Sequence, residues 1–271
     1  MSLVETDWLE KNLDHVKIID CSWHMPQTKR NGFDEYKTQH IPETIFFDLD
    51  FNSKKNIQLP HMLVNIDSWE KIVSKMGIKI NDKIIIYDNS DVSSACRCWY
   101  NFIYFGHNPK LVHVLNGGLK KWIAERRKVT TDLPNVEVSN YKSLEKKELV
   151  KNKNLIDKNI DTQKFKVIDA RSKERFEGMV GEPRKGLRSG NIKYSFCIPF
   201  NQCLNENKTF KNKKELKNVF RSCLKNINEK NIVFSCGSGV TACVLAIAYS
   251  LINDKYLPII YDGSWAEYGK I

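Results

Sequence analysis

The feature that most constrains this chain is the repetition of the same short motifs, in the same order, in its two halves. The pair Ile19-Asp20 matches Ile168-Asp169, and residues 84–87 match residues 232–235. Further on, the NGG of residues 116–118 matches the DGS of residues 262–264. The spacing between matching motifs is nearly constant, which is typical of a duplicated domain. We therefore predict two domains of similar fold.

Short apolar runs alternate with longer amphipathic stretches in both halves, a pattern typical of α/β units on a parallel sheet. The predicted strands are residues 16–20, 45–50, 83–88, 111–115, 165–170, 195–200, 231–236 and 257–262. Helical patterns include residues 68–78, 94–106 and 242–252. The predicted fold class is α/β, with two tandem domains that are each a mainly parallel sheet flanked by helices. We place the first domain at residues 1–128, a polar linker at 129–150 and the second domain at 151–271.

The composition narrows the class of protein. Of 271 residues, 43 are Lys or Arg and 32 are Asp or Glu, so the formal net charge is +11. The lysines alternate with asparagines, and aromatic residues are not interleaved among them, which argues against nucleic-acid binding. The positive charge instead favours small anions. The longest apolar stretch, residues 242–252, is too short for a bilayer, so we expect no membrane partner and a cytoplasmic location.

The eight cysteines show no paired C-x-x-C spacing, so we predict reduced thiols and no metal site. Cys236 stands apart from the others because it opens a glycine-bearing loop between a predicted strand and a predicted helix. Such a loop gathers backbone N–H groups around one point, where they stabilise an anion. We expect Cys236 to be a nucleophilic thiolate. The loop residues predicted to bind the substrate are Gly237, Gly239, Val240 and Thr241.

The corresponding loop of the first half begins with Asp88 and lacks both the cysteine and the glycines. Only the second domain is therefore predicted to be catalytic. A phosphate-transferring cysteine loop would need an arginine six positions after the cysteine, and that position is Ala242. A cysteine hydrolase would need a histidine base. All six histidines lie in the first half, at positions 15, 24, 40, 61, 107 and 113.

Four segments together resemble the mercaptopyruvate sulfurtransferases, a branch of the two-domain rhodanese family. They are the loop CGSGVTA, the stretch ARSKERFEGMVGEPRKGLRSGNI, the stretch that begins with IFFDLD and ends with LPHML, and the ending YDGSWAEY. The resemblance runs from about Val16 to Tyr268. It implies two rhodanese-like domains and an enzyme that moves sulfur from 3-mercaptopyruvate to the active cysteine as a persulfide, releasing pyruvate. A thiol such as thioredoxin or a small thiol, or cyanide, then accepts the sulfur. We expect no cofactor, no metal and a monomer.

The resemblance also assigns roles to residues. Cys236 matches the persulfide-forming cysteine, while Arg175 and Arg184 match two arginines that hold the substrate's carboxylate and keto oxygen. Without the resemblance, an ion pair explains either arginine better. Three further residues match a proposed proton relay: Ser238, His61 and Asp50. Packing at an interface is the alternative role for His61.

The donor and the class of activity leave alternatives open. Thiosulfate-using rhodaneses resemble one another in carrying basic residues just after the cysteine, whereas Gly237 and Ser238 are neutral. This favours mercaptopyruvate, with a thiosulfate sulfurtransferase as the alternative. A persulfide carrier or interaction module without turnover is a second alternative, and a cysteine hydrolase a third.

Overall fold

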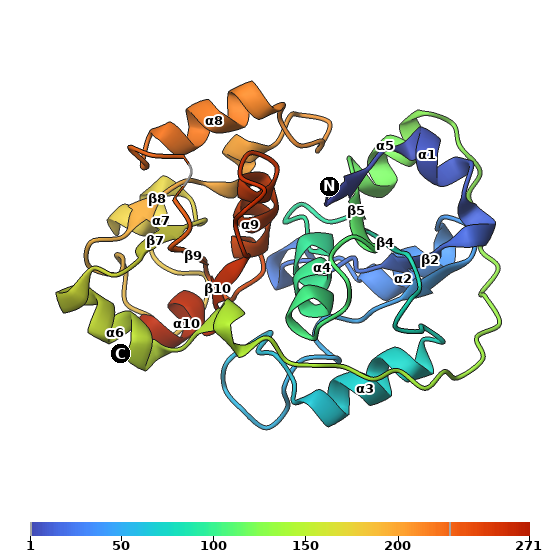
Figure 1. Cartoon of the computed structure of the whole chain (residues 1–271), viewed down its shortest axis with the longest axis horizontal. Coiled ribbons are helices and arrows are strands. Elements are labelled where there is room, and N and C mark those ends of the chain that lie inside the picture. Colours follow the sequence, from blue (N-terminus) through green and yellow to red (C-terminus); the bar gives the residue numbers. More distant parts are fainter. Residues whose placement is uncertain (1, 228) are drawn as a thin grey trace. The chain divides into compact units, whose positions relative to one another are not determined.

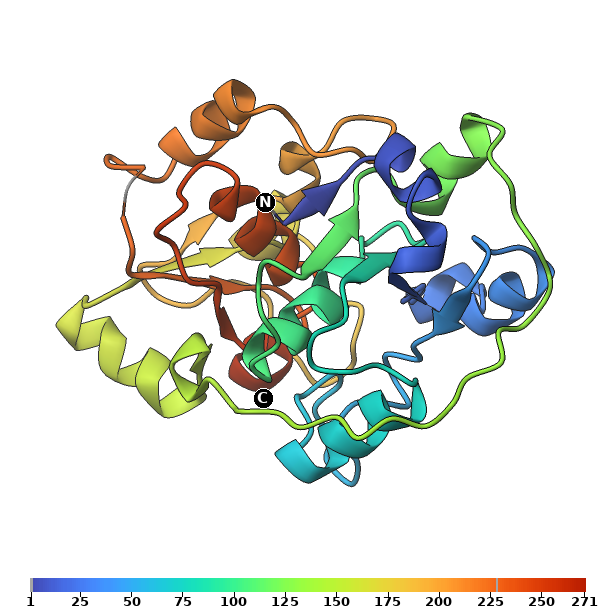
Figure 2. The same ribbon diagram turned by 45° about the vertical axis from the view of Figure 1, so that its right-hand side comes forward.

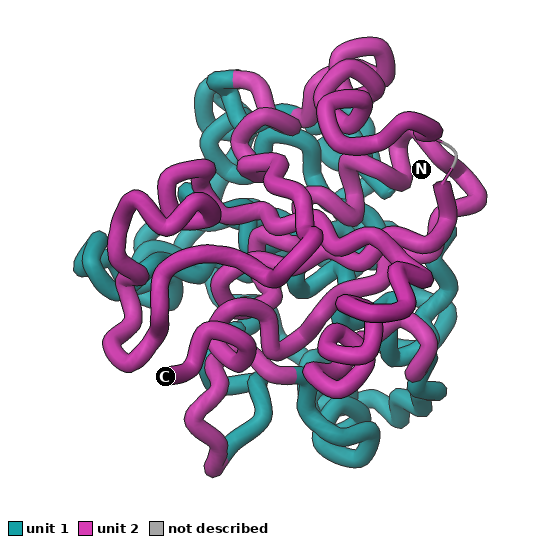
Figure 3. Tube along the Cα trace, turned by 90° about the vertical axis from the view of Figure 1, so that its left-hand side faces the viewer, with its two compact units in different colours: residues 1–55, 63–146, 206–209 teal, residues 56–62, 147–205, 210–271 magenta. Residues whose placement is uncertain are grey.

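The computed structural model describes residues 2–227 and 229–271. The chain forms two compact units, coloured separately in Figure 3. Unit 1 comprises Met1–Lys55, Leu63–Lys146 and Glu206–Thr209, and unit 2 comprises Asn56–Met62, Lys147–Asn205 and Phe210–Ile271. Each unit therefore includes a short piece from the other half of the sequence. The domain boundaries proposed above at 128, 150 and 151 stay a prediction.

Unit 1 is built on a five-stranded sheet in the order β1-β5-β4-β2-β3, and every strand pair in it is parallel (Figure 1). Its strands are β1 (Leu3–Val4), β2 (Lys17–Asp20), β3 (Thr44–Phe46), β4 (Ile84–Tyr87) and β5 (Val112–Leu115). Its helices are α1 (Thr6–Glu10), α2 (Gly32–Thr38), α3 (Ile66–Lys75), α4 (Ala95–Tyr104) and α5 (Gly118–Ala124), with 3₁₀ turns η1 (Leu13–His15) and η2 (Pro26–Thr28).

Unit 2 has a sheet of the same design, in the order β6-β10-β9-β7-β8 and again with parallel pairs. Its strands are β6 (Val150–Lys151), β7 (Lys166–Asp169), β8 (Phe196–Cys197), β9 (Ile232–Ser235) and β10 (Ile259–Tyr261). Its helices are α6 (Lys153–Thr162), α7 (Lys173–Glu177), α8 (Lys213–Arg221), α9 (Ala242–Ser250) and α10 (Ser264–Tyr268), with 3₁₀ turns η3 (Lys147–Leu149) and η4 (Phe200–Cys203). The predicted α/β fold with parallel sheets is confirmed.

Two predicted strands are much shorter than their apolar runs suggest. The run 45–50 is extended only to Phe46, and the run 195–200 only at β8. Both strands lie at the edge of their sheet, so they pair on one side only. Pro199 has no N–H with which to continue the ladder, and a 3₁₀ turn starts directly after it. The edge strands β1 and β6 were not predicted because two residues are too few to show a period.

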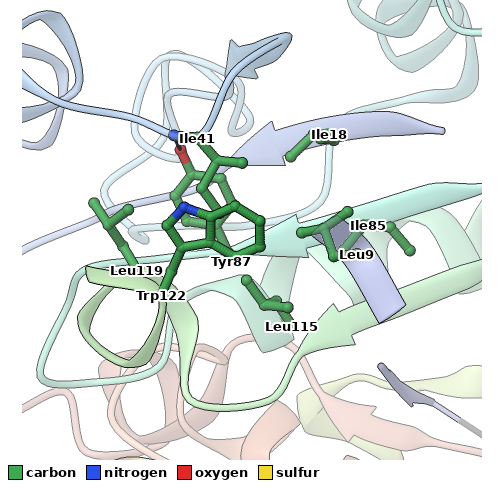
Figure 4. Close-up of a cluster of buried hydrophobic side chains, with 8 residues drawn as sticks. All are labelled: Leu9, Ile18, Ile41, Ile85, Tyr87, Leu115, Leu119 and Trp122. Atoms are coloured by element: carbon green, nitrogen blue, oxygen red, sulfur yellow. Dashed lines mark hydrogen bonds between the residues drawn. The ribbon is translucent and has the colours of Figure 1, made fainter. Parts of the chain in front are cut away.

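Apolar residues at matching positions of the two halves form the hydrophobic core of each unit. In unit 1 a buried cluster joins the sheet to α1 and α5 (Figure 4), and its members are Leu9, Ile18, Ile41, Ile85, Tyr87, Leu115, Leu119 and Trp122. The cluster in unit 2 consists of Ile156, Val167, Ile192, Val233, Tyr261 and Trp265. Burial of such side chains contributes about 1.5–3 kcal/mol each. The sequence repeat therefore reflects two cores built from matching positions.

The central helix of each unit is buried almost all round. Helix α4 packs along β4 and β5, and α9 packs along β9 and β10 (Figure 1 and Figure 2). Residues 242–249 of α9 are all buried, which explains why the helix is apolar on every side. Because α9 starts a few residues after β9 ends, the loop between them lies at the carboxyl edge of a parallel sheet. Open α/β sheets bind their ligands at this edge.

The segment predicted to be a linker packs on unit 1 up to Lys146. Thr130 pairs with His40 through backbone hydrogen bonds, and the buried Tyr141 hydroxyl lies 3.0 Å from Nδ1 of His107. These contacts hold the segment against unit 1 up to Lys146. Within residues 2–227 and 229–271, no helix is both long and apolar enough to cross a bilayer.

Candidate active site

The loop from Cys236 to Thr241 is held in place by the start of α10. The carbonyl oxygens of Cys236 and Gly237 accept hydrogen bonds from the N–H groups of Trp265 (2.9 Å) and Ala266 (2.8 Å). The N–H of Cys236 donates to Ser264 Oγ at 3.1 Å, and this hydroxyl donates to the carbonyl oxygen of Tyr261 at 2.8 Å. These bonds tie the loop carbonyls to α10. Because the N–H of a trans peptide points opposite to its carbonyl, the N–H groups of Gly237 and Ser238 point away from α10.

Most of those N–H groups are available to a ligand. Within the described part of the chain, the N–H groups of Gly237, Ser238, Val240 and Thr241 donate to no protein group. Gly239 has a φ of +76°, a left-handed conformation that glycine adopts without strain. The Cys236 side chain is almost fully buried beside them, directly after the end of β9. The loop has the form of an anion-binding nest with a thiol at its edge.

Two guanidinium groups lie beside this loop. A Cβ atom added to Gly237 would lie 3.3 Å from Nη2 of Arg175 and 3.7 Å from Nη1 of Arg184. Both arginines therefore approach the residue that directly follows Cys236. A glycine at position 237 leaves room for them, because any larger side chain would press against the cations. The structure thus brings together the cysteine and both arginines named from the sequence.

Arg175 is oriented by a buried carboxylate that sequence analysis missed. Glu182 accepts hydrogen bonds from Nη2 of Arg175 at 2.5 Å and from its Nε at 3.3 Å. The same carboxylate accepts from Nη1 of the buried Arg171 at 2.6 Å, and Arg171 is paired in turn with Asp169. The Glu182 side chain is only 2% exposed. A glutamate among arginines in a polar stretch gives no sequence signal that it will be buried.

His61 reaches the loop from the first half of the sequence. Its Nδ1 lies 2.9 Å from Ser238 Oγ, and Nη2 of Arg184 donates to the same Oγ at 3.4 Å. His61 is 3% exposed and has a φ of +59°, which is strained for a residue with a Cβ. His61 belongs to the 56–62 segment that packs in unit 2.

Asp50, the third member of the predicted relay, belongs to unit 1. Its Oδ2 accepts a hydrogen bond from Nε1 of Trp23 at 2.8 Å. The structure thus gives a geometry for the His61–Ser238 pair, and the participation of Asp50 stays a prediction. Val240 is buried and Thr241 is the N-cap residue of α9, and their role in substrate binding stays a prediction.

The corresponding loop of unit 1 contains its own anion. Asp88 follows β4 as Cys236 follows β9, and its carbonyl oxygen accepts from the N–H of Leu119 at 3.1 Å. Its carboxylate accepts from the N–H and the hydroxyl of Ser90 and from the N–H of Ala95, at 2.7–2.9 Å. Burial raises the pKa of Asp88 against the effect of these bonds. A carboxylate therefore fills the place that a bound anion would take.

Four of the other cysteines are buried or partly buried thiols with a raised pKa. Burial raises the pKa of Cys197 and Cys203 to about 12, and it also raises the pKa of Cys21 and Cys223. Such thiols are protonated and unreactive near neutral pH. Among the described residues, no group of three or more His, Cys, Asp or Glu side chains has the arrangement of a metal site.

Known proteins resemble this chain over nearly its full length. The rhodanese-like domain model matches residues 5–125 and 152–270. Thiosulfate/3-mercaptopyruvate sulfurtransferase 1, mitochondrial, of Arabidopsis thaliana is 37% identical over 98% of this chain and 75% of that protein. The 3-mercaptopyruvate sulfurtransferase of Mus musculus is 32% identical over 98% of this chain and 91% of that protein. The thiosulfate sulfurtransferase of Rattus norvegicus is 31% identical over the same shares.

Solved structures agree with the sequence comparison. SseA from Escherichia coli, described as a 3-mercaptopyruvate sulfotransferase with the rhodanese fold, superposes with a TM-score of 0.86 and is 29% identical. The match covers 98% of this chain and all of the SseA chain. The predicted fold of two rhodanese-like domains is confirmed, and this chain belongs to the rhodanese family.

Proposed function

We propose that the protein is a 3-mercaptopyruvate sulfurtransferase that carries sulfur on Cys236. The observation that carries the proposal is the approach of two guanidinium groups to Gly237, directly beside the cysteine and its anion-binding loop. An α-keto acid needs fixed cations for its carboxylate, and arginine supplies a planar pair of donors. Relatives whose names include this activity support the same conclusion.

Substrate binding is the first role of the site. Arg175 and Arg184 bind the carboxylate and the keto oxygen of 3-mercaptopyruvate, and the thiol end of the substrate is directed toward Cys236. Because Glu182 holds Arg175 by two hydrogen bonds, this guanidinium is oriented before substrate arrives. Orientation in advance lowers the entropy cost of reaching a reactive geometry.

Sulfur transfer is the second step. The Cys236 thiolate attacks the substrate sulfur, so a sulfur–sulfur bond forms while the bond between that sulfur and C3 breaks. The electron pair of the broken bond remains on C3 as the enolate of pyruvate, which the keto oxygen and its arginine stabilise. The thiol proton of the substrate ends on C3, so the products are pyruvate and the persulfide of Cys236. The loop N–H groups stabilise the persulfide anion.

Ser238 and His61 carry the proton. Nη2 of Arg184 donates to Ser238 Oγ, and in the proposed relay the serine O–H donates to Nδ1 of His61 while the ring proton is on Nε2. This pair moves the proton from the substrate thiol toward the enolate carbon, as a histidine near neutral pH can. Asp50 completes the proposed relay.

The second half of the cycle regenerates the enzyme. A thiol attacks the outer sulfur of the persulfide and takes it, and the Cys236 thiolate leaves. The acceptor that we propose is a protein thiol such as that of thioredoxin, or a small thiol. We also propose that the protein acts as a monomer in the cytoplasm, although one relative's name assigns that relative to mitochondria. Tagging and cell fractionation would test the location.

Thiosulfate is the second candidate donor, because a thiosulfate sulfurtransferase is also among the relatives. Pyruvate release from 3-mercaptopyruvate with a reducing thiol should be measured beside thiocyanate formation from thiosulfate and cyanide. We expect fast pyruvate formation that Cys236→Ser abolishes, and weak turnover of thiosulfate. Equal activity of Cys236→Ser would refute the mechanism. If neither donor is turned over, the protein would instead be a persulfide carrier.

A further inference from the structure

A cavity of about 590 Å³ lies within unit 1, apart from the Cys236 loop. Three stretches of chain line it. They are residues 51–55, residues 63–65 and the first turns of α3 at Ser68, Lys71 and Ile72. The cavity is open to solvent, with Phe51 and its three lysines exposed, and its volume is within the range of small-molecule binding sites. None of the residues assigned above to sulfur transfer lines it.

The charge of the cavity is positive and uncompensated. Lys54, Lys55 and Lys71 line it, and no aspartate or glutamate does. Lys55 donates to the backbone carbonyl oxygen of Asp50 and lies over the ring of Phe51. Within residues 2–227 and 229–271, Lys54 and Lys71 form no ion pair. Three cations gathered around one cavity without an acid attract an anion.

The remaining wall is apolar. Phe51 is 70% exposed, an unusual state for a phenylalanine, and Leu63, Val64 and Ile72 complete the apolar lining. An apolar wall removes hydrocarbon or aromatic surface of a ligand from water, at about 25 cal/mol per Å². The lysines can therefore bind the charged groups of a ligand while the apolar wall contacts its hydrocarbon or aromatic part.

We propose that this cavity binds a small organic anion whose charged groups contact Lys54 and Lys71 and whose aromatic or hydrocarbon part packs on Phe51 and Leu63. The site is separate from sulfur transfer and stands on the cavity alone. Its lining includes both flanks of the 56–62 segment, which leaves unit 1 after Lys55 and returns at Leu63. A bound anion would join the two flanks and restrict the segment between them.

Naphthalene-1,5-disulfonate is a suitable probe, because it combines an aromatic body with two charges, and inorganic phosphate is the charge-only comparison. Calorimetric titration of the full chain should show binding of the disulfonate that weakens at higher salt and is much tighter than binding of phosphate. We expect Lys54→Glu/Lys71→Glu to weaken binding at least about tenfold, which is about 1.4 kcal/mol. Phe51→Ala should weaken binding of the disulfonate but leave binding of phosphate unchanged.

The matched control is Lys213→Glu/Lys214→Glu, which makes the same change in net charge on exposed residues of α8. It should bind the disulfonate as the wild type does. Lys54→Ala serves as a milder variant if the double replacement does not fold, and thermal melts check both. Hydrogen exchange of residues 56–62 should slow when the probe binds. No binding by the wild type at millimolar probe, or equal loss in the control variant, would overturn the proposal.

Discussion

Glu182 holds Arg175 through both of its carboxylate oxygens, and its side chain is almost completely buried. In the proposed mechanism Arg175 binds substrate, so Glu182 is a positioning residue. Its effect on sulfur transfer should appear in substrate binding more than in the chemical step.

Replacing this carboxylate by an amide tests that role. Glu182→Gln keeps the shape but loses the charge-assisted bonds to two arginines. We expect KM for 3-mercaptopyruvate to rise about tenfold and kcat to change less than about threefold, because ground-state and transition-state contacts of Arg175 are lost together. Glu174→Gln, which changes an exposed glutamate beside Arg175 on α7, is the control. Equal kinetics of Glu182→Gln and wild type would show that Arg175 does not depend on Glu182.

Removing one of the substrate-binding arginines should impair sulfur transfer more than Glu182→Gln does. Arg184→Ala removes a cation and the donor to Ser238 Oγ, so it should raise KM and lower kcat/KM for 3-mercaptopyruvate by about a hundredfold. Steady-state pyruvate release measures both parameters. An unchanged kcat/KM would place Arg184 outside the site.

Two glycines of the loop should respond differently to alanine. At Gly237 the backbone accepts a side chain, but the new Cβ would lie 3.3 Å from Nη2 of Arg175. Gly237→Ala should therefore raise KM with little change in stability. Gly239 has a φ of +76°, so Gly239→Ala should cost about 1 kcal/mol in the free energy of unfolding. Urea unfolding and steady-state kinetics of both variants would distinguish crowding of Arg175 at position 237 from backbone strain at position 239.

The proton pair can be tested by removing the serine hydroxyl. Ser238→Ala leaves His61 without its partner at 2.9 Å, so the proton has no direct path from Ser238 to the ring. We expect kcat for pyruvate release to fall about a hundredfold, as for loss of general acid–base help. KM should rise less, since both arginines remain. A kcat within about twofold of wild type would remove Ser238 from proton transfer.

The buried Asp20 predicts an unusual pH dependence of stability. Burial and the nearby Asp88 outweigh the hydrogen bonds from Ser22, and they raise the pKa of Asp20 from 3.8 to about 7. The folded state therefore holds a proton that the unfolded state has lost, and the stability it contributes is lost as pH rises from about 4 through 7. Asp20→Asn should raise the free energy of unfolding at pH 8 by about 2 kcal/mol and flatten this dependence.

Asp169 provides the matched comparison in unit 2. It holds the position of Asp20 in the repeat, but Arg171 pairs with it where unit 1 has Ser22. Asp169→Asn should destabilise by about 3–5 kcal/mol, because it leaves a buried guanidinium without this partner. Urea unfolding at pH 5 and pH 8 measures both variants. The same sign of effect for Asp20→Asn and Asp169→Asn at pH 8 would contradict this account.

The sequence predicts the fold well because its strands are short apolar runs in a repeated order. It also predicts Cys236, because a thiol at the start of a glycine-bearing loop has a recognisable chemistry. Burial of single polar residues is not visible in this way. Nothing in the letters around Glu182 distinguishes it from an exposed glutamate, and nothing around Ser264 shows that its hydroxyl orients the N–H of Cys236.

The sequence also does not show which of the two units residues 56–62 pack with. His61 falls within the first predicted domain, residues 1–128. The 56–62 segment nevertheless packs with unit 2, which follows from contacts between residues 177 positions apart. Local patterns do not encode such a pairing.

Residues 56–62 come from the first half of the sequence but pack in unit 2, and this limits where the chain can be divided. A gene cut at the polar segment near residue 140 would give a second polypeptide with the cysteine, the loop and both arginines, yet without its histidine partner for Ser238. The second half of the sequence is therefore not self-sufficient, because its site includes a histidine from the first half. Both halves must be present, in one chain or in two that associate, for the site to be complete.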